Sequence, residues 1–96
     1  MAINVELTVL CDNHAPGELQ AEHGQAFWMV APELKLLFDT GSGQTLAQNV
    51  AQLQIPLDEC QMVVLSHGHY DHTGGLTAVL THAKKKLPVY IHRDAF

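Results

Sequence analysis

Three histidines and an aspartate occur within six residues of the segment LSHGHYDHTGGL, residues 65–76. Such side chains are costly to desolvate, and a bound metal ion is the obvious way to offset that cost. Residues two apart in an extended segment point the same way, so His67 and His69 can present their imidazoles to one point. Asp71 and His72 follow as the chain turns into a helix, which gives a second pair of ligands beside the first.

These donors indicate a metal site but do not select one metal. Neutral imidazoles and a carboxylate suit zinc, and also iron or manganese. Gly68 and the pair Gly74-Gly75 let the backbone bend and approach closely, as a ligand loop requires. A solvated histidine-rich loop and an acid–base patch without metal are the alternatives. The position of the cluster, at the carboxyl end of an apolar strand where open α/β sheets place their sites, favours the metal.

The elements that must position this cluster follow from the hydrophobic pattern. Strands are predicted at 3–10, 25–31, 34–39, 61–65 and 88–92. The first alternates apolar and polar residues, which predicts one face in water, and the fourth is apolar and β-branched throughout its core, which indicates a strand covered on both faces. Pro32-Glu33 forms a turn between the second and third strands. Residues 11–24 have no periodicity and are predicted to form a long loop.

Two helices are predicted between these strands. The first starts after 39-DTGSG-43, has an apolar stripe and ends before Pro56; its stripe consists of Leu46, Ala47, Val50, Ala51 and Leu53. The second opens at Thr73-Gly74-Gly75, and its apolar face consists of Leu76, Val79, Leu80, Ala83 and Leu87. Lysines 84–86 are expected in its last turn, where they oppose the negative end of the helix dipole. The predicted order is β-β-β-α-β-α-β.

Bulk composition narrows the function classes. A chain of 96 residues that is 47% hydrophobic and 16% charged is expected to form one globular domain. A net charge of −5 argues against a nucleic-acid partner, and no apolar run is long enough to span a membrane, so we expect a cytoplasmic protein. Cys11 and Cys60 are expected to be ordinary small buried residues. Phe27 and Trp28 are expected in the core.

The pattern His67-x-His69-x-Asp71-His72, after an apolar strand and downstream of Asp39 in LFDTG, resembles the signature of the metallo-β-lactamase fold superfamily. The segments VLCDN, AEHG, LLFDTG and VVLSHGHYDHTGGL together are similar to its subgroup of dihydropterin–ribofuranosylaminobenzene phosphate synthase-like metal-dependent hydrolases. This resemblance covers nearly the whole chain. It implies an α/β fold in which residues 1–96 form the N-terminal αβ half of an αββα sandwich, a mixed sheet with helices on one face.

The resemblance also implies roles for individual residues. His67 and His69 are expected to bind a first metal ion, and Asp71 with His72 a second, most simply zinc, with iron or manganese as alternatives. Asp39 is expected beneath the ligand loop, holding it by hydrogen bonds. Such a site activates water to hydrolyse an ester, amide or phosphate-type bond of a small-molecule substrate, and Asp71 is the expected catalytic proton acceptor. Four residues are expected to face the substrate: Asp12, Asn13, Glu22 and His23.

The chain departs from the family pattern in length. Members of the family are considerably longer, and their second half supplies further ligands that have no counterpart after Ile91. We therefore expect an N-terminal half alone, with an incomplete active site, weaker metal binding and an exposed sheet face that promotes homodimerisation or requires the missing C-terminal half. The main hypothesis is a metal-dependent hydrolase domain. The alternative is a metal-binding or self-assembling module without turnover.

Overall fold

The computed structural model describes residues 4–12, 17, 19, 24–43, 45–66, 70–83 and 85–91, without the side chains of Tyr70, Asp71 and His82. Its elements are, in order, β1 (Glu6–Cys11), β2 (Ala26–Ala31), β3 (Leu34–Phe38), α1 (Leu46–Gln52), the short 3-10 helix η1 (Leu57–Glu59), β4 (Met62–Leu65), α2 (Tyr70–Thr73), α3 (Leu76–Ala83) and β5 (Val89–Ile91). The predicted order of strands and longer helices is confirmed, and η1 and α2 are additions to it.

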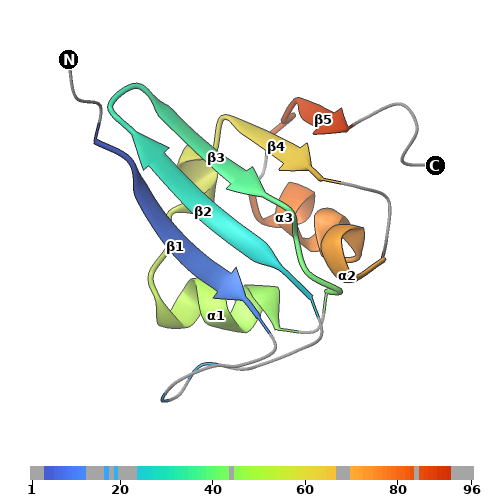
Figure 1. The fold of residues 1–96 in the computed structure, drawn as a ribbon. Helices are drawn as coiled ribbons and strands as arrows, with labels where there is room; N and C mark the ends of the chain where they lie inside the picture. Colours follow the sequence, from blue (N-terminus) through green and yellow to red (C-terminus); the bar gives the residue numbers. More distant parts are fainter. Residues whose placement is uncertain are drawn as a thin grey trace.

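The strands form one mixed sheet in the order β1-β2-β3-β4-β5. β1, β2 and β3 pair antiparallel, whereas β3, β4 and β5 pair parallel. Each parallel connection passes through a helix, α1 and then α3, and both step in the same direction along the sheet. Because such crossovers are right-handed, both helices fall on the same side of the sheet (Figure 1). This confirms the predicted α/β class with helices on one face.

The hydrophobic core lies between that face and the helices. Trp28, Leu37 and Val63 from the sheet belong to one buried cluster with Leu46 of α1 and Val79 of α3. Trp28 is therefore in the core, as predicted. Cys11 and Cys60 are both buried and neither forms a disulfide, which also confirms their predicted role as small core residues.

The side of β1 that contacts the helices is not the one that its alternating pattern suggests. Leu7 and Val9 are 57% and 47% exposed, whereas Leu10 is buried. The helices pack against the face that carries the even-numbered residues, and a bulge between Val9 and Cys11 turns Cys11 inward as well. The prediction of one face in water is correct, but that face is the apolar one.

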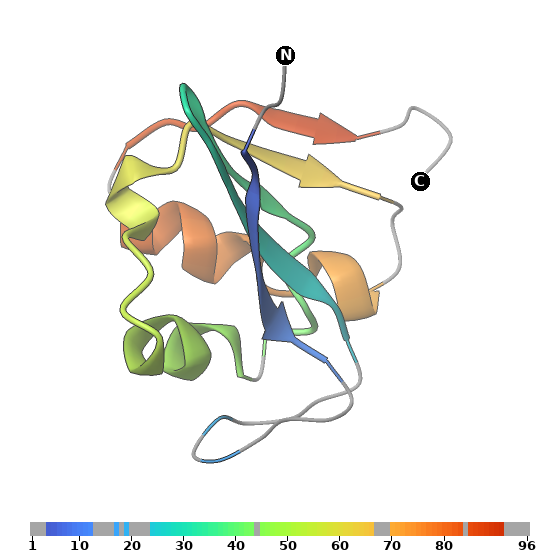
Figure 2. The ribbon, with the colours of Figure 1, turned by 60° about the vertical axis from the view of Figure 1, so that its left-hand side comes forward.

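Strand β4, like β1, has one face toward the helices and one face away from them. Val63 and Leu65 are buried under the helices, while Met62 and Val64 are only partly buried on the opposite face. The prediction that this strand is covered on both faces is wrong. Phe27 also lies on that opposite face and is only partly buried. Figure 2 shows the sheet nearly edge-on, with the helices on one side of it.

The helices differ from prediction at their ends. Leu53, predicted in the apolar stripe, follows α1 and is 37% exposed. The buried side chains of α1 are Leu46, Val50 and Asn49, and the Asn49 amide donates to the carbonyl of Leu10 at 2.8 Å. α3 ends at Ala83, so Lys85 and Lys86 follow the helix instead of forming its last turn. Within the described part of the chain, none of the helices is long and apolar enough to cross a membrane.

Candidate functional site

Asp39 is the first residue after β3, and its backbone turns sharply there. Its φ of 62° lies in the left-handed region, which a non-glycine residue adopts at a cost of about 1 kcal/mol or more. Its N–H still extends the parallel ladder by donating to the carbonyl of Val64 at 2.8 Å. The turn places a carboxylate that is 1% exposed at the carboxyl ends of β3 and β4.

Two neighbours share this buried carboxylate. Ser66, directly after β4, donates its N–H to Oδ1 and its hydroxyl to Oδ2, each at 2.7 Å. His72, in α2, places Nδ1 at 2.7 Å from the same Oδ2. Asp39 thus connects the end of β3 to both ends of the segment that carries the histidine cluster. Its carboxylate contacts Ser66 and His72, the described residues on either side of positions 67–71.

The contact with Asp39 fixes which nitrogen of His72 carries the proton. An ionised carboxylate only accepts hydrogen bonds, so Nδ1 must be the donor. In the neutral imidazole the lone pair is then on Nε2, the atom through which such a ring binds a metal ion or accepts a proton. The side chain of His72 is 13% exposed, so protein atoms surround most of the ring while a small part of it remains accessible.

Thr40 holds the backbone of the same segment. Its N–H donates to the carbonyl of His72 at 2.7 Å, and its hydroxyl donates to that carbonyl at 3.0 Å. The hydroxyl also accepts the N–H of Gly75 at 3.0 Å. Thr40 is completely buried, so these bonds are shielded from water. His72 is therefore fixed through its ring by Asp39 and through its backbone by Thr40.

The glycine pair makes this contact possible. A Cβ on Gly75 would lie 2.3 Å from the carbonyl oxygen of Thr40, and one on Gly74 would lie 2.3 Å from that of Ser42. Real Cβ atoms do not approach backbone oxygens so closely. The close backbone approach predicted for Gly74-Gly75 is confirmed, and the backbone it contacts is that of residues 40–42.

Several predicted site residues lie outside the described residues: His67, His69, Asn13, Glu22 and His23. Asp71 is placed by its backbone in α2 alone, and Asp12 is exposed just after β1. Among the side chains that the structure describes, no group of three histidine, cysteine, aspartate or glutamate residues is arranged to hold a metal ion. The structure therefore describes the support of the predicted site and one of its ligands, His72.

Sequence reasoning missed Ser66 and Thr40. Each stands next to a residue that was identified, Ser66 one position before His67 and Thr40 one position after Asp39. Hydroxyl side chains at the carboxyl ends of two adjacent parallel strands were the available signal, because such positions meet at one edge of the sheet.

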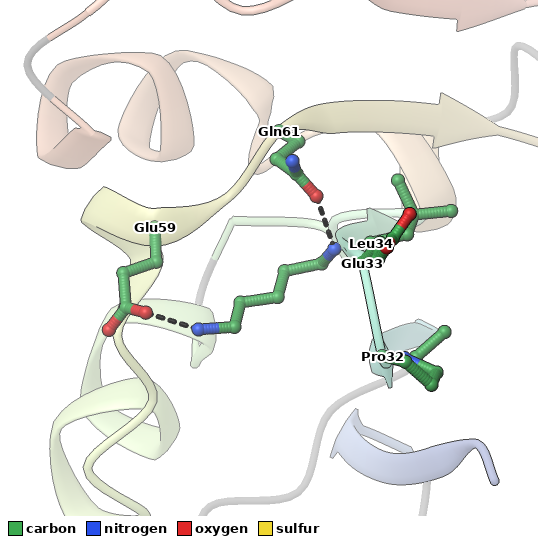
Figure 3. A pocket seen from close by; sticks show the side chains of 7 residues that line it. Pro32, Glu33, Leu34, Glu59 and Gln61 are labelled. Atoms are coloured by element: carbon green, nitrogen blue, oxygen red, sulfur yellow. Dashed lines mark hydrogen bonds and ion pairs between the residues drawn. The ribbon is translucent and has the colours of Figure 1, made fainter.

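A surface hollow lies at the other end of β3. A pocket of about 260 Å³ surrounds the β2–β3 turn and is lined by Ala31, Pro32, Glu33, Leu34, Lys35, Glu59 and Gln61. The Lys35 ammonium pairs with Glu59, and the Lys35 N–H donates to the Gln61 side chain at 2.7 Å (Figure 3). Since Leu34 and Asp39 are at opposite ends of the strand, this pocket is separate from the Asp39–His72 cluster.

Comparison with known proteins gives one family. The model of the metallo-beta-lactamase superfamily matches residues 20–96. One curated relative is the 7,8-dihydropterin-6-methyl-4-(beta-D-ribofuranosyl)-aminobenzene-5'-phosphate synthase of Methanocaldococcus jannaschii. It is 28% identical over a match that covers 97% of this chain and 34% of the relative's length. The hydroxyacylglutathione hydrolase of Aeromonas hydrophila is 36% identical over 57% of this chain and 21% of its own.

Solved structures agree with this result. Tm1679, described as a metal-dependent hydrolase of the β-lactamase superfamily, matches 97% of this chain and 32% of its own at 32% identity, with a TM-score of 0.73. The metallo-β-lactamase fold protein YhfI of Bacillus subtilis matches 95% of this chain and 38% of its own, with a TM-score of 0.69. At 23% identity, YhfI supports the fold alone. The chain spans about a third of the length of the relatives that match nearly all of it.

Proposed function

This chain belongs to the metallo-β-lactamase superfamily, and we propose that it acts as a metal-dependent hydrolase domain. The observation that carries the proposal is the 2.7 Å contact between Asp39 Oδ2 and His72 Nδ1. A buried carboxylate that holds one nitrogen of a histidine, and so leaves the other free, is the usual support of a metal-binding imidazole. Asp39 therefore fits the predicted metal site.

The proposed ligands come from one short segment. His67 and His69 hold one divalent ion, and His72 through Nε2, with Asp71, holds a second; zinc is the proposed metal, with iron or manganese as alternatives. When bound, such ions activate water near neutral pH and polarise the bond under attack. Asp71 is the proposed proton acceptor. Thr40 and Asp39 keep His72 in place while these groups act.

The proposed reaction is hydrolysis of an ester, amide or phosphate-type bond in a small molecule. The names of two similar proteins support this class, since one is a hydrolase of hydroxyacylglutathione and the other, Tm1679, is described as a metal-dependent hydrolase. A fold supports many substrates, so only the bond class is proposed.

Activity against generic substrates tests this proposal. The wild-type chain, loaded with zinc or manganese, should hydrolyse a nitrophenyl ester or a bis-nitrophenyl phosphodiester. His69→Ala should abolish the activity, whereas His82→Ala, which removes a histidine from α3 outside the cluster, should retain it. Equal activity in both variants, or hydrolysis unaffected by chelation, would rule the proposal out.

A second function is a metal-binding module without turnover. It is favoured by the observation that the chain spans about a third of the length of its relatives, because a metal site can form on one short segment without a complete catalytic site around it. Metal bound in proportion to chain, lost in His69→Ala, together with no hydrolysis of either substrate, would select this alternative.

A further inference from the structure

Ser66 contacts both oxygens of the buried Asp39 carboxylate. Its backbone N–H donates to Oδ1 and its hydroxyl donates to Oδ2, each at 2.7 Å. The terminal torsion of an aspartate has only a broad preference, so one hydrogen bond leaves the plane of the carboxylate poorly defined. Donors on both oxygens fix that plane. Ser66 therefore determines where Oδ2 lies relative to its other partner, His72.

The Ser66 hydroxyl and His72 Nδ1 meet at the same carboxylate oxygen. Both atoms lie 2.7 Å from Oδ2 and 3.5 Å from one another, so they approach that oxygen from different directions. Each carboxylate oxygen has two lone-pair positions, and the two donors can occupy one each. The arrangement therefore leaves room for both hydrogen bonds at once.

The two donors differ in how firmly they are held. Ser66 reaches Oδ2 through a single side-chain torsion, and its own backbone is bonded to the same carboxylate. The His72 ring is set by two side-chain torsions, and the bonds from Thr40 go to the backbone of His72 instead of its ring. Ser66 is thus the fixed reference for Oδ2, and the ring aligns to that oxygen.

We infer that Ser66 is a positioning residue: through Asp39, its hydroxyl fixes the orientation of the His72 ring and thereby raises the metal affinity of that ring. The consequence for metal binding rests on the proposed function, whereas the effect on the ring does not. Ser66 is exposed, so substitutions there leave no cavity in the core and keep the N–H on Oδ1. Threonine and valine have nearly the same shape, so Ser66→Thr and Ser66→Val differ chiefly in the hydroxyl.

The His72 Nδ1 proton of the metal-free chain provides the first measurement. Its chemical shift and its exchange with water, from proton and nitrogen spectra, report the bond to Asp39. In wild type and Ser66→Thr the proton should lie downfield and exchange slowly, as a charge-assisted bond of 2.7 Å requires. In Ser66→Val and Ser66→Ala it should move upfield and exchange faster, because the carboxylate is no longer aligned with the ring. If the hydroxyl instead competes with Nδ1 for Oδ2, its removal should move the proton downfield.

Zinc affinity from a chelator competition provides the second measurement. It should fall about tenfold in Ser66→Val and Ser66→Ala and remain near the wild-type value in Ser66→Thr. Thr81→Ala, which removes an exposed hydroxyl from α3, is the control and should change neither quantity. A downfield or unchanged Nδ1 proton in Ser66→Val, or equal behaviour of Ser66→Val and Ser66→Thr, would overturn the inference. A wild-type chain that binds no zinc would contradict the proposed function, while the metal-free spectra would still decide the role of Ser66.

Discussion

His72 Nδ1 and Asp39 Oδ2 lie 2.7 Å apart although the two residues are 33 positions apart in the chain. The contact joins α2 to the end of β3, and it assigns the proton of the neutral ring to Nδ1, so that Nε2 is the nitrogen suited to bind a metal ion. The four predictions that follow concern this contact, the backbone around it and the buried thiol of Cys60.

Replacing the carboxylate by an amide should change the tautomer of His72. In Asp39→Asn, an amide NH₂ directed at the ring makes Nδ1 an acceptor, so the proton moves to Nε2. Zinc affinity should fall about 10- to 100-fold. Nitrogen chemical shifts of the metal-free protein report the tautomer, and a chelator competition reports the affinity. Asp58→Asn, an exposed position in η1, is the control and should change neither.

Removing the hydroxyl of Thr40 should loosen the backbone of His72. Thr40→Val removes one of the two acceptors of the Gly75 N–H, which also donates to the Gly41 carbonyl at 3.2 Å, and should lower the free energy of unfolding by about 1 kcal/mol. Thr40→Ser keeps the hydroxyl and should recover most of this loss and the metal affinity. Urea denaturation and chelator competition measure both quantities. A loss of stability in Thr40→Ser with none in Thr40→Val would mean that the methyl group matters, not the hydrogen bonds.

A methyl group on Gly75 should separate the two backbone segments. Gly75→Ala places Cβ 2.3 Å from the Thr40 carbonyl oxygen and should lower the free energy of unfolding by about 2–3 kcal/mol, because neither backbone can give way easily. Gly17→Ala is the control for glycine conformation, because Gly17 has nothing within 4 Å but a φ of 63°, and it should cost about 1–2 kcal/mol from backbone strain alone. Thermal unfolding of both variants decides whether close approach or glycine flexibility matters.

Cys60 should make the fold less stable at alkaline pH. Burial raises the pKa of the Cys60 thiol above its ordinary value of 9.0, while hydrogen bonds with the backbone of Met62 and Leu37 oppose this shift. From about pH 9 upward the unfolded chain loses this proton while the folded chain keeps it, so stability falls until the folded thiol also ionises. Urea denaturation from pH 7 to 10 should show this decline, and Cys60→Ala should reduce it. A slope unchanged by Cys60→Ala would assign the decline to other groups.

The sequence predicted the order of elements because apolar runs and glycine breaks are local signals. The contact between Asp39 and His72 concerns two positions that a family motif carries, and the role of Asp39 beneath the cluster stays a prediction. The sequence did not predict which face of β1 is covered, since the alternation of Leu7 and Val9 with Glu6 and Thr8 locates an apolar face without stating what packs on it. The two right-handed crossover connections determine which face the helices cover, and their positions depend on the strand order of the whole sheet.

The parts of the site that were missed depend on long-range contacts. Thr40 and Gly75 are 35 positions apart, and only the folded sheet brings the carboxyl end of β3 against the turn before α3. Asn49 was missed for the same reason, because its amide satisfies a carbonyl of β1 that the local pattern of α1 cannot reveal.

Metal content tests the central claim most directly. The purified wild-type chain, dialysed against zinc and then against buffer, should retain one or two ions per chain by plasma mass spectrometry. The double variant His67→Ala with His69→Ala should lose at least one ion, and His72→Ala should bind less than wild type while remaining folded. A folded wild-type chain that retains no metal, or one whose metal content is unchanged in these variants, would contradict the account.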